Sequence, residues 1–268
     1  GGRELWLDGE PVERAGEYLA ASGLVVWMGN DDLELVKGPG EVRRRYLDFL
    51  AAQVFPEYRV ALRGYEKALR SRNRLLKDYR VNWGQVDAYT AVLVRHGEVV
   101  VRCRRELVGE LSPVAAGAHA EIGGNGETLG VAYVPGADGE LGQVLEAARP
   151  ADERRRQTTV GPHRDDFEVL VNGMGAGKYA SEGQQRTVAL ALKLAQAREL
   201  EARKERVPLL LLDDIFGELD PGRRNLLLGA LPAGSQKLVT TTHLDWAESG
   251  VSPEVVYSVS AGRVSRGD

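Results

Sequence analysis

The stretch Leu209–Asp220, which reads LLLLDDIFGELD, constrains the fold more than any other part of the chain. Four consecutive leucines predict a strand that is buried on both faces, as in the middle of a parallel sheet. The two aspartates that follow must leave the core, because burying an ionised carboxylate is very costly. In open α/β sheets, ligands bind at this carboxyl end of the strands. We therefore expect a ligand site there; a solvated acidic turn is the alternative.

The residues at this end are suited to phosphate chemistry. We expect Asp213 to hold Mg²⁺, directly or through water, and Asp214 to orient a water molecule beside a phosphate. Asp220 follows six residues after Asp214, immediately before a predicted helix. His243 ends the run Thr-Thr-Thr-His after the next predicted strand, which makes it a candidate to contact a terminal phosphate. A satisfied polar group is the other interpretation of this histidine.

The second half of the chain predicts α/β winding, because strands and helices alternate there. A further motif, YASEGQQRT, covers 179–187 and precedes a long predicted helix. A helix start offers unpaired N–H groups and the positive end of the dipole, which favour an anion. Ser181 is alternatively no more than the cap of that helix. The predicted elements are strands at Phe167–Val171, Leu209–Leu212 and Lys237–Thr241, and helices at Gly183–Arg203 and Arg223–Ala230.

The first half predicts a more helical region. Two long helical stretches, Pro56–Arg80 and Gln85–Leu111, are most simply an antiparallel helical hairpin. A Gly-Gly-Asn-Gly run between Ala118–Ile122 and Thr128–Tyr133 predicts a β-hairpin. The remaining expected elements are a strand in 3–9 that ends in a turn, a helix at Val12–Ala21, a strand at Leu24–Met28, and helices at Glu41–Val54 and Leu141–Ala148.

The first long helical stretch is strongly basic, with eight Lys or Arg residues in Arg59–Arg80 against Glu66 and Asp78. The chain as a whole carries a net charge of −4, so any nucleic-acid binding needs such a local basic face. A solvated helix face is the alternative, and Arg154–Arg156 form a second basic cluster. The candidate DNA contacts are Arg63, Lys67, Arg70, Arg72, Arg74 and Lys77.

Composition excludes several other classes of protein. Cys103 is the single cysteine, which rules out an internal disulfide framework or a cysteine zinc site and fits a reducing, cytoplasmic location. No apolar stretch approaches the roughly 18 residues that a membrane span needs, and we expect no signal peptide. With 43% hydrophobic residues, the chain is long enough for one large or two modest domains.

The order of the motifs resembles the head of an ATP-binding-cassette (ABC) ATPase: a signature motif, a Walker B strand, a D-loop and a switch histidine. More specifically, the chain resembles the RecF family of DNA-repair ATPases, relatives of the chromosome-maintenance heads. The runs that carry this resemblance are DDLELVKGPGEVRRRYLDFL (31–50), YEKALRSRNRLLKD (65–78), GPHRDDFEVLVNG (161–173), YASEGQQRTVALALKLAQA (179–197) and LLLLDDIFGELD (209–220).

The resemblance implies an ABC-type head, a mixed sheet with helices, that carries an inserted helical lid. It also implies a protein that binds ATP and Mg²⁺, dimerises on ATP, binds double-stranded or gapped DNA without sequence preference, and works with RecO and RecR to load RecA. The residues implied to contact ATP, in part that of the partner subunit, are Ser181, Gly183, Gln184, Arg186 and Asp220.

The chain departs from the family in one important respect. A phosphate-binding P-loop of the form GxxxxGK[ST] is expected near the N-terminus but does not occur in the sequence. The run GMGAGK (173–178) is a decoy, because Asn172 and Tyr179 occupy the positions where the motif needs Gly and Ser or Thr. We therefore expect the P-loop unit to be missing, and this chain alone to lack ATPase activity.

We expect three parts: 1–40 as the remainder of the N-terminal head lobe, 41–135 as the helical lid with a β-hairpin, and 136–268 as the C-terminal head lobe. Two alternatives to a weak ATPase remain. One is a non-catalytic clamp that binds only DNA or partners. The other is a different chromosome-maintenance-like head, although the helical insertion is short for a coiled-coil arm.

Overall fold

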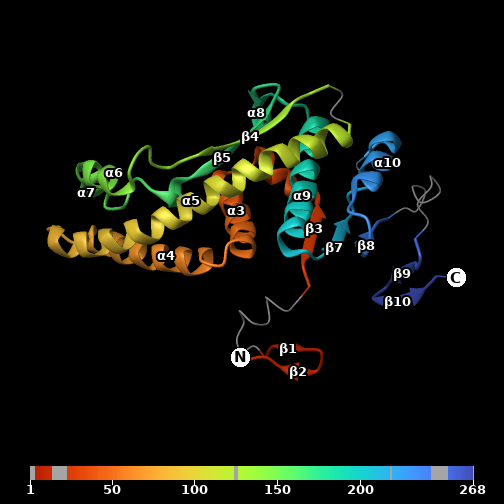
Figure 1. The fold of residues 1–268 in the computed structure, drawn as a ribbon, viewed down its shortest axis with the longest axis horizontal. Helices are drawn as coiled ribbons and strands as arrows, with labels where there is room; N and C mark the ends of the chain where they lie inside the picture. Colours follow the sequence, from red (N-terminus) through yellow and green to blue (C-terminus); the bar gives the residue numbers. More distant parts are fainter. Residues whose placement is uncertain (1–3, 14–22, 124–125, 218, 243–252, 268) are drawn as a thin grey trace.

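The computed structural model describes residues 4–13, 23–123, 126–217, 219–242 and 253–267 (Figure 1). A three-stranded parallel sheet contains the leucine strand β7 (Leu209–Asp213) in the middle, between β3 (Val25–Gly29) and β8 (Lys237–Thr240). Gly29, Asp213 and Thr240 pair at the same level of the three strands. The predicted parallel sheet, and the carboxyl edge that carries the aspartates, are therefore confirmed.

The two faces of this sheet differ in burial. Leu210 and Leu212 are fully buried, whereas Leu209 and Leu211 are only partly buried. Trp27 and Leu238, which flank Leu211 on the same face, are 38% and 51% exposed. The expectation of a strand covered on both faces is thus correct for one face only within the described residues.

Helix α9 (Glu182–Lys204) packs beside the sheet and contains much of the core. Its buried side chains include Val188, Leu192 and Leu200, and it contacts β3 and the long helix α5. Apolar residues on these elements belong to one continuous core cluster. The helix that opens with the YASEGQQRT motif is therefore held rigidly against the sheet.

A second sheet is antiparallel, in the order β4 (Leu129–Val134), β5 (Asp166–Val171) and β6 (Met174–Gly175). Asn172 and Gly173, with φ of 51° and 77°, form the tight turn between β5 and β6. This backbone matches the turn type that Asn-Gly favours. The run GMGAGK therefore continues a β-hairpin into a short helix, α8 (Ala176–Tyr179), as expected for a decoy rather than a P-loop.

The predicted β-hairpin at Ala118–Ile122 and Thr128–Tyr133 is wrong. Helix α5 (Trp83–Glu121) continues ten residues past its expected end, through Pro113, and β4 pairs with β5 instead. The small side chains Ala115 and Ala118 are fully buried where α5 packs on β4 and α9, so packing overrides the turn signal. This pairing also crosses the boundary that the sequence placed at 135.

Helices α4 (Tyr58–Leu75) and α5 form the predicted antiparallel helical hairpin. We call residues 58–111 the lid, and the turn 76–82 that joins the two helices the lid tip. Figure 1 shows the lid projecting away from the parallel sheet, with α6 (Leu141–Ala147) and α7 (Arg149–Arg155) beside its far half.

A buried arginine fixes the lid to the rest of the molecule. Arg104 of α5 is 2% exposed; it donates to Asp48 at 2.6 Å and to Asp165 at 2.9 Å. It also donates to the Tyr58 hydroxyl oxygen at 2.9 Å and to the Pro162 carbonyl at 2.7 Å. The GPHRDD run, which contains Pro162 and Asp165, is therefore the joint between lid and head.

The other elements agree with most of the predictions. The strand in 3–9 is the first arm of a small hairpin, and the helix predicted at Val12–Ala21 lies almost wholly outside the described residues. The bounds are β1 (Trp6–Leu7), β2 (Glu10–Pro11), η1 (Asn30–Leu33), α2 (Glu34–Lys37), α3 (Gly40–Val54), η2 (Pro162–Arg164), α10 (Pro221–Ala230), β9 (Tyr257–Ser260) and β10 (Arg263–Arg266).

Candidate nucleotide and DNA sites

The carboxyl edge of the parallel sheet carries the acidic pair. Asp213 is exposed, and its Oδ1 accepts a hydrogen bond from the Thr240 hydroxyl at 2.5 Å. A carboxylate beside a hydroxyl is an oxygen donor set, and Mg²⁺ is commonly held by one or two carboxylates together with water and phosphate oxygens. The residues present therefore fit Mg²⁺, although no cluster of three His, Cys, Asp or Glu residues occurs within the described ranges.

Asp214 has an unusual backbone. Its φ is 50°, in the left-handed region that residues with a side chain rarely adopt. Its N–H lies 3.1 Å from both the carbonyl oxygen and the hydroxyl oxygen of Thr240, which holds the turn in place. Such strain costs on the order of 1 kcal/mol and is common at functional sites. The turn separates the two carboxylates, since Asp213 ends the strand and Asp214 is half-buried beyond it.

The start of α9 is closed by its own side chains. The Ser181 Oγ accepts from the Gln184 N–H at 3.3 Å, and the Gln184 Oε1 accepts from the Ser181 N–H at 2.6 Å. This reciprocal capping box satisfies two N–H groups that an anion would otherwise meet. Ser181 therefore has the capping role that the sequence left open. An anion could bind these N–H groups only if the two hydrogen bonds of the capping box broke.

An acidic side chain also contacts this helix start. The Gln184 Nε2 donates to Glu127 Oε1 at 2.6 Å, and the other oxygen of Glu127 lies 3.8 Å from the His119 Nε2. His119 is fully buried, and neither ring nitrogen has a hydrogen-bond partner. Burial lowers the His119 pKa, with Glu127 opposing the shift and Arg223 adding to it. Sequence reasoning missed these residues, because they come from the segment predicted as a β-hairpin.

Arg223 connects two of the predicted motifs. A Cβ placed on Gly183 would lie 3.0 Å from the Arg223 Nη1, so the arginine covers this glycine closely. The Arg223 N–H donates to Asp220 Oδ1 at 3.0 Å, which caps α10. The structure therefore brings Gly183 and Asp220 to the same place.

Of the two remaining predicted site residues, the structure describes only Arg186. Arg186 forms an ion pair with Glu182 at 3.0 Å on its own helix. His243 lies outside the described residues.

The predicted DNA-contacting cations divide into two groups. Five are exposed and recur at steps of three and four residues, so they share one face of α4 and its end. Arg72 is a correction: it points to the opposite side and is 1% exposed. It donates to Asp152 at 2.8 Å, to Thr158 at 2.7 Å and to Thr90 at 2.9 Å, so it cannot contact DNA in this conformation. The five exposed cations, which we call the basic face, are Arg63, Lys67, Arg70, Arg74 and Lys77.

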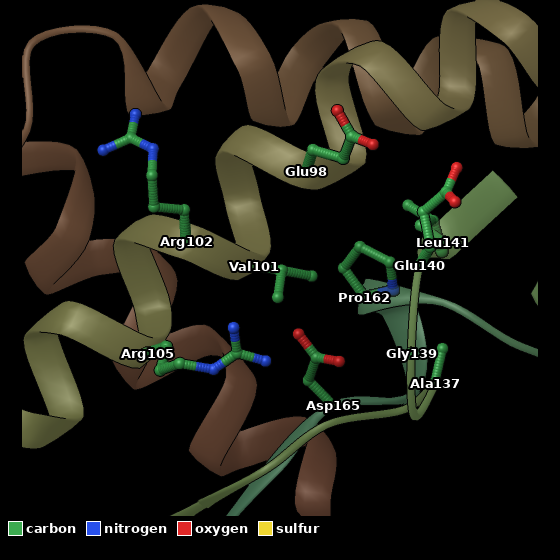
Figure 2. Close-up of a pocket in the computed structure, with 10 residues that line it drawn as sticks. All are labelled: Glu98, Val101, Arg102, Arg105, Ala137, Gly139, Glu140, Leu141, Pro162 and Asp165. Atoms are coloured by element: carbon green, nitrogen blue, oxygen red, sulfur yellow. The ribbon is translucent and has the colours of Figure 1, made fainter.

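A shallow pocket of about 190 Å³ lies between α5 and the loop before α6 (Figure 2). Its charged lining residues are Glu98, Arg102, Arg105, Glu140 and Asp165, so the charges nearly cancel. Arg105 also lies over the Tyr133 ring, 5.7 Å from its centroid. We assign no ligand to this pocket, because its lining residues carry no dominant charge.

Comparisons with known proteins give one consistent result. The chain is 42% identical over 282 residues to the DNA replication and repair protein RecF of an Anaeromyxobacter species, covering 99% of this chain and 75% of that one. It is 40% identical over 266 residues to RecF of a Synechococcus species, covering 93% and 70%. A scan against protein-family models found no match.

Solved structures agree. A structure of the recombination mediator protein RecF with ATP, in the RecFOR pathway, superposes with a TM-score of 0.87 at 28% identity and covers 100% of this chain and 74% of that one. The Smc head domain of Pyrococcus furiosus shares the fold, with a TM-score of 0.52 at 14% identity. The predicted ABC-type head is therefore confirmed, and the chain belongs to the RecF family of DNA replication and repair proteins.

Proposed function

We propose that this chain is the signature-bearing and DNA-binding part of an ATP-dependent recombinational repair protein. The observation that carries the proposal is the parallel register that aligns Asp213 with Thr240 and places Asp214 just beyond them. This is the edge at which α/β sheets bind ligands. ATP binding by the RecF protein of known structure supports ATP as the nucleotide here.

The roles at this edge follow from charge and position. Asp213 holds Mg²⁺, with Thr240 orienting its carboxylate, and Asp214 positions the attacking water. His243 lies outside the described residues, and its proposed contact with the γ-phosphate rests on the sequence alone. When bound, Mg²⁺ neutralises charge on the phosphates. Catalysis is then positioning and charge stabilisation, and the residues do not form a covalent intermediate.

The signature segment acts on the nucleotide of a second copy of the chain. Ser181, Gly183 and Gln184 present the start of α9 to the partner's ATP, with Arg186 and Asp220 beside it. The capping box opens as the phosphate replaces the side-chain oxygens. Glu127 moves with Gln184 at that moment, because the two side chains are hydrogen-bonded. ATP therefore drives dimerisation, and hydrolysis releases it.

The lid provides the DNA surface. Arg63 to Arg74 extend over about 16 Å of helix, at 1.5 Å per residue, which corresponds to roughly five base pairs. Their side chains reach phosphates and do not read bases, so binding is independent of sequence. The lid belongs to a proposed insertion, 41–135, between proposed head lobes 1–40 and 136–268, and β4 at the end of this insertion pairs with β5 of the second lobe. RecO and RecR are the expected protein partners, through which RecA is loaded.

A second candidate, a clamp without ATPase activity, is favoured for the chain as given by one observation. Its sequence contains no GxxxxGK[ST], so no lysine and backbone amides are available to hold the β- and γ-phosphates. The described helices also include none that is long and apolar enough to cross a membrane. ATP turnover in a full-length form that carries a phosphate-binding loop distinguishes the candidates, because only the ATPase should cleave ATP there.

The experiment that tests the proposal is ATP-dependent dimerisation in a full-length form that carries a phosphate-binding loop. Ser181→Arg should leave ATP binding to the monomer intact, because Ser181 acts on the partner's nucleotide. It should abolish dimers in sedimentation with ATP. Ala202→Arg, exposed near the other end of α9, is the matched control and should dimerise normally. If the Ser181 variant dimerised as well as wild type, Ser181 would serve only as the N-cap of α9.

A further inference from the structure

The lid tip presents one aromatic side chain almost completely to solvent. Tyr79 is 92% exposed, more than any other large apolar or aromatic side chain among the described residues. It lies in the turn 76–82, at the far end of the lid from the parallel sheet (Figure 1). A single exposed ring is common on protein surfaces, so a role for Tyr79 must be argued from the groups that surround it.

The surroundings of this ring are basic. Arg80 follows it directly and Lys77 precedes it by two residues; both are exposed, as is Asp78 between Lys77 and the ring, so this part of the turn has two cations against one acid. Arg156 donates hydrogen bonds to the carbonyl oxygens of Asp78 and Leu76, which places the end of α7 against the lid tip. Arg154 and Arg155, next in the chain, are exposed as well. The two basic clusters, which the sequence left as alternative DNA sites, therefore meet at one end of the lid.

The turn that carries Tyr79 is braced from both sides. Besides the Arg156 contacts, the Arg149 guanidinium lies 5.0 Å from the centre of the Trp83 ring and pairs with Asp87 at 2.7 Å. Arg149 and Arg156 belong to or border α7, so two points of that element fix the ends of the turn. A ring presented by a fixed backbone loses less entropy on binding than one on a free loop.

The combination of an exposed ring and surrounding cations fits one ligand chemistry. Aromatic rings bind nucleic acids by stacking on a base, and the neighbouring cations hold the phosphates on either side. A continuous duplex offers no free base face except at the cost of unstacking, whereas an unpaired base at a gap offers one directly. We propose that Tyr79 stacks on an unpaired base at a break in duplex DNA, and that the lid thereby prefers gapped to continuous DNA.

This inference rests on the proposed function, because the basic face must hold the adjoining duplex. The two contributions differ in their response to salt. Rising salt weakens the phosphate contacts, which the gapped and the continuous complex share. Stacking on a base releases few counterions and therefore depends little on salt. The ratio of the two affinities should therefore stay constant with salt while each affinity falls.

The test measures the affinity of this chain for a gapped and a continuous duplex of equal length, across a range of salt. Tyr79→Ala should leave the affinity for continuous duplex unchanged and reduce that for gapped duplex about tenfold, within the range of one base stack. Tyr79→Phe should keep the preference, and Tyr79→Leu should lose it. Tyr89→Ala, which removes another partly exposed ring of the lid, is the matched control and should change neither affinity.

A direct probe is 2-aminopurine as the first unpaired base of the gap, since stacking quenches its fluorescence. Wild type and Tyr79→Phe should quench it, and Tyr79→Ala should not. The inference would be overturned if wild type showed no preference for gapped DNA, or if the preference survived Tyr79→Ala. Tyr79 would then be a candidate for a protein contact instead. Weaker binding of Arg70→Ala with Arg74→Ala to both the gapped and the continuous duplex, which the proposed function requires, is a separate result: unchanged binding to both would refute the basic face.

Discussion

Arg72 on the lid and Asp152 on α7 form a buried ion pair at 2.8 Å, with side chains 1% and 0% exposed. Thr158 and Thr90 accept the remaining guanidinium hydrogen bonds, and Asp152 also accepts from the Thr159 N–H and hydroxyl. The pair joins the last turn of α4, next to the lid tip, to the α6–α7 segment. One cation of the basic run is thus used for structure while its neighbours face solvent.

Removing Arg72 should therefore affect stability and not DNA contact. Arg72→Ala leaves the Asp152 carboxylate buried without its partner, which should reduce the free energy of unfolding by about 3–5 kcal/mol. Arg70→Ala, whose pair with Glu66 is exposed and 3.8 Å long, is the control and should cost less than about 1 kcal/mol. Urea unfolding measures both. Equal losses would mean that the Arg72 pair contributes no more than a surface pair.

The basic face makes a quantitative prediction for salt dependence. Replacing Arg63, Lys67, Arg70 and Arg74 with Ala should weaken binding to all duplex sequences about equally. The slope of log K against log salt should flatten by roughly 0.9 for each phosphate that the variant no longer neutralises. Fluorescence anisotropy with two unrelated duplexes is the measurement. A slope identical to wild type would exclude the basic face as the DNA site.

Glu127 should oppose ATP-driven dimerisation. Its carboxylate contacts Gln184 beside the proposed phosphate position, so it repels the partner's nucleotide. Glu127→Gln keeps an oxygen that can accept from Gln184 but removes the charge, and should tighten the dimer about fivefold. Sedimentation in ATP with a full-length form measures this. Weaker dimers would show instead that Glu127 supports the signature segment.

The buried His119 should make stability fall at acid pH. Burial lowers its pKa below the usual 6.5, so the unfolded chain binds the proton more readily than the folded chain. The contribution of neutral His119 is therefore complete above about pH 6.5 and decreases as pH falls through the lowered pKa. Glu127 and Arg223 are the charged groups that face the ring.

The comparison that isolates this effect is urea unfolding of wild type and His119→Gln at several pH values between about 5 and 7.5. His163, whose pKa burial also lowers, remains in both proteins and cancels. The stability difference should shift in favour of the variant as pH falls. A difference that does not change with pH would mean that His119 titrates as it does in the unfolded chain.

The sequence allowed the parallel strand, its acidic end and the signature helix to be predicted, because each follows from local pattern. Four leucines followed by two aspartates require burial to end abruptly, and Ser181 begins a long periodic helix. What failed depended on distant contacts. The Gly-Gly-Asn-Gly signal did not specify a partner strand, so β4 was paired wrongly, and α5 continued because Ala115 and Ala118 pack against the core.

The sequence likewise did not show which side chains of the basic run Arg59–Arg80 face solvent and which are buried. The spacing of Arg72 from Arg70 and Arg74 places it on another side of the helix, but charge alone gave no sign that Asp152, distant in the chain, would bury it. Arg223 and Glu127 at the signature segment were missed for the same reason. Their roles depend on how α5 and α10 meet α9, which no local pattern encodes.

Asp214 is the residue that we propose to position the water that cleaves ATP, at the edge of β7. The most direct measurement is ATP turnover together with dimer fraction for Asp214→Asn in a full-length form that carries a phosphate-binding loop. Asp213→Asn, which removes charge from the metal position, serves as the comparison and should bind Mg²⁺-ATP poorly and dimerise little. Asp214→Asn should bind ATP, accumulate closed dimers and show no turnover above background. Turnover at the wild-type rate would contradict the claim and reduce the two aspartates to an acidic turn.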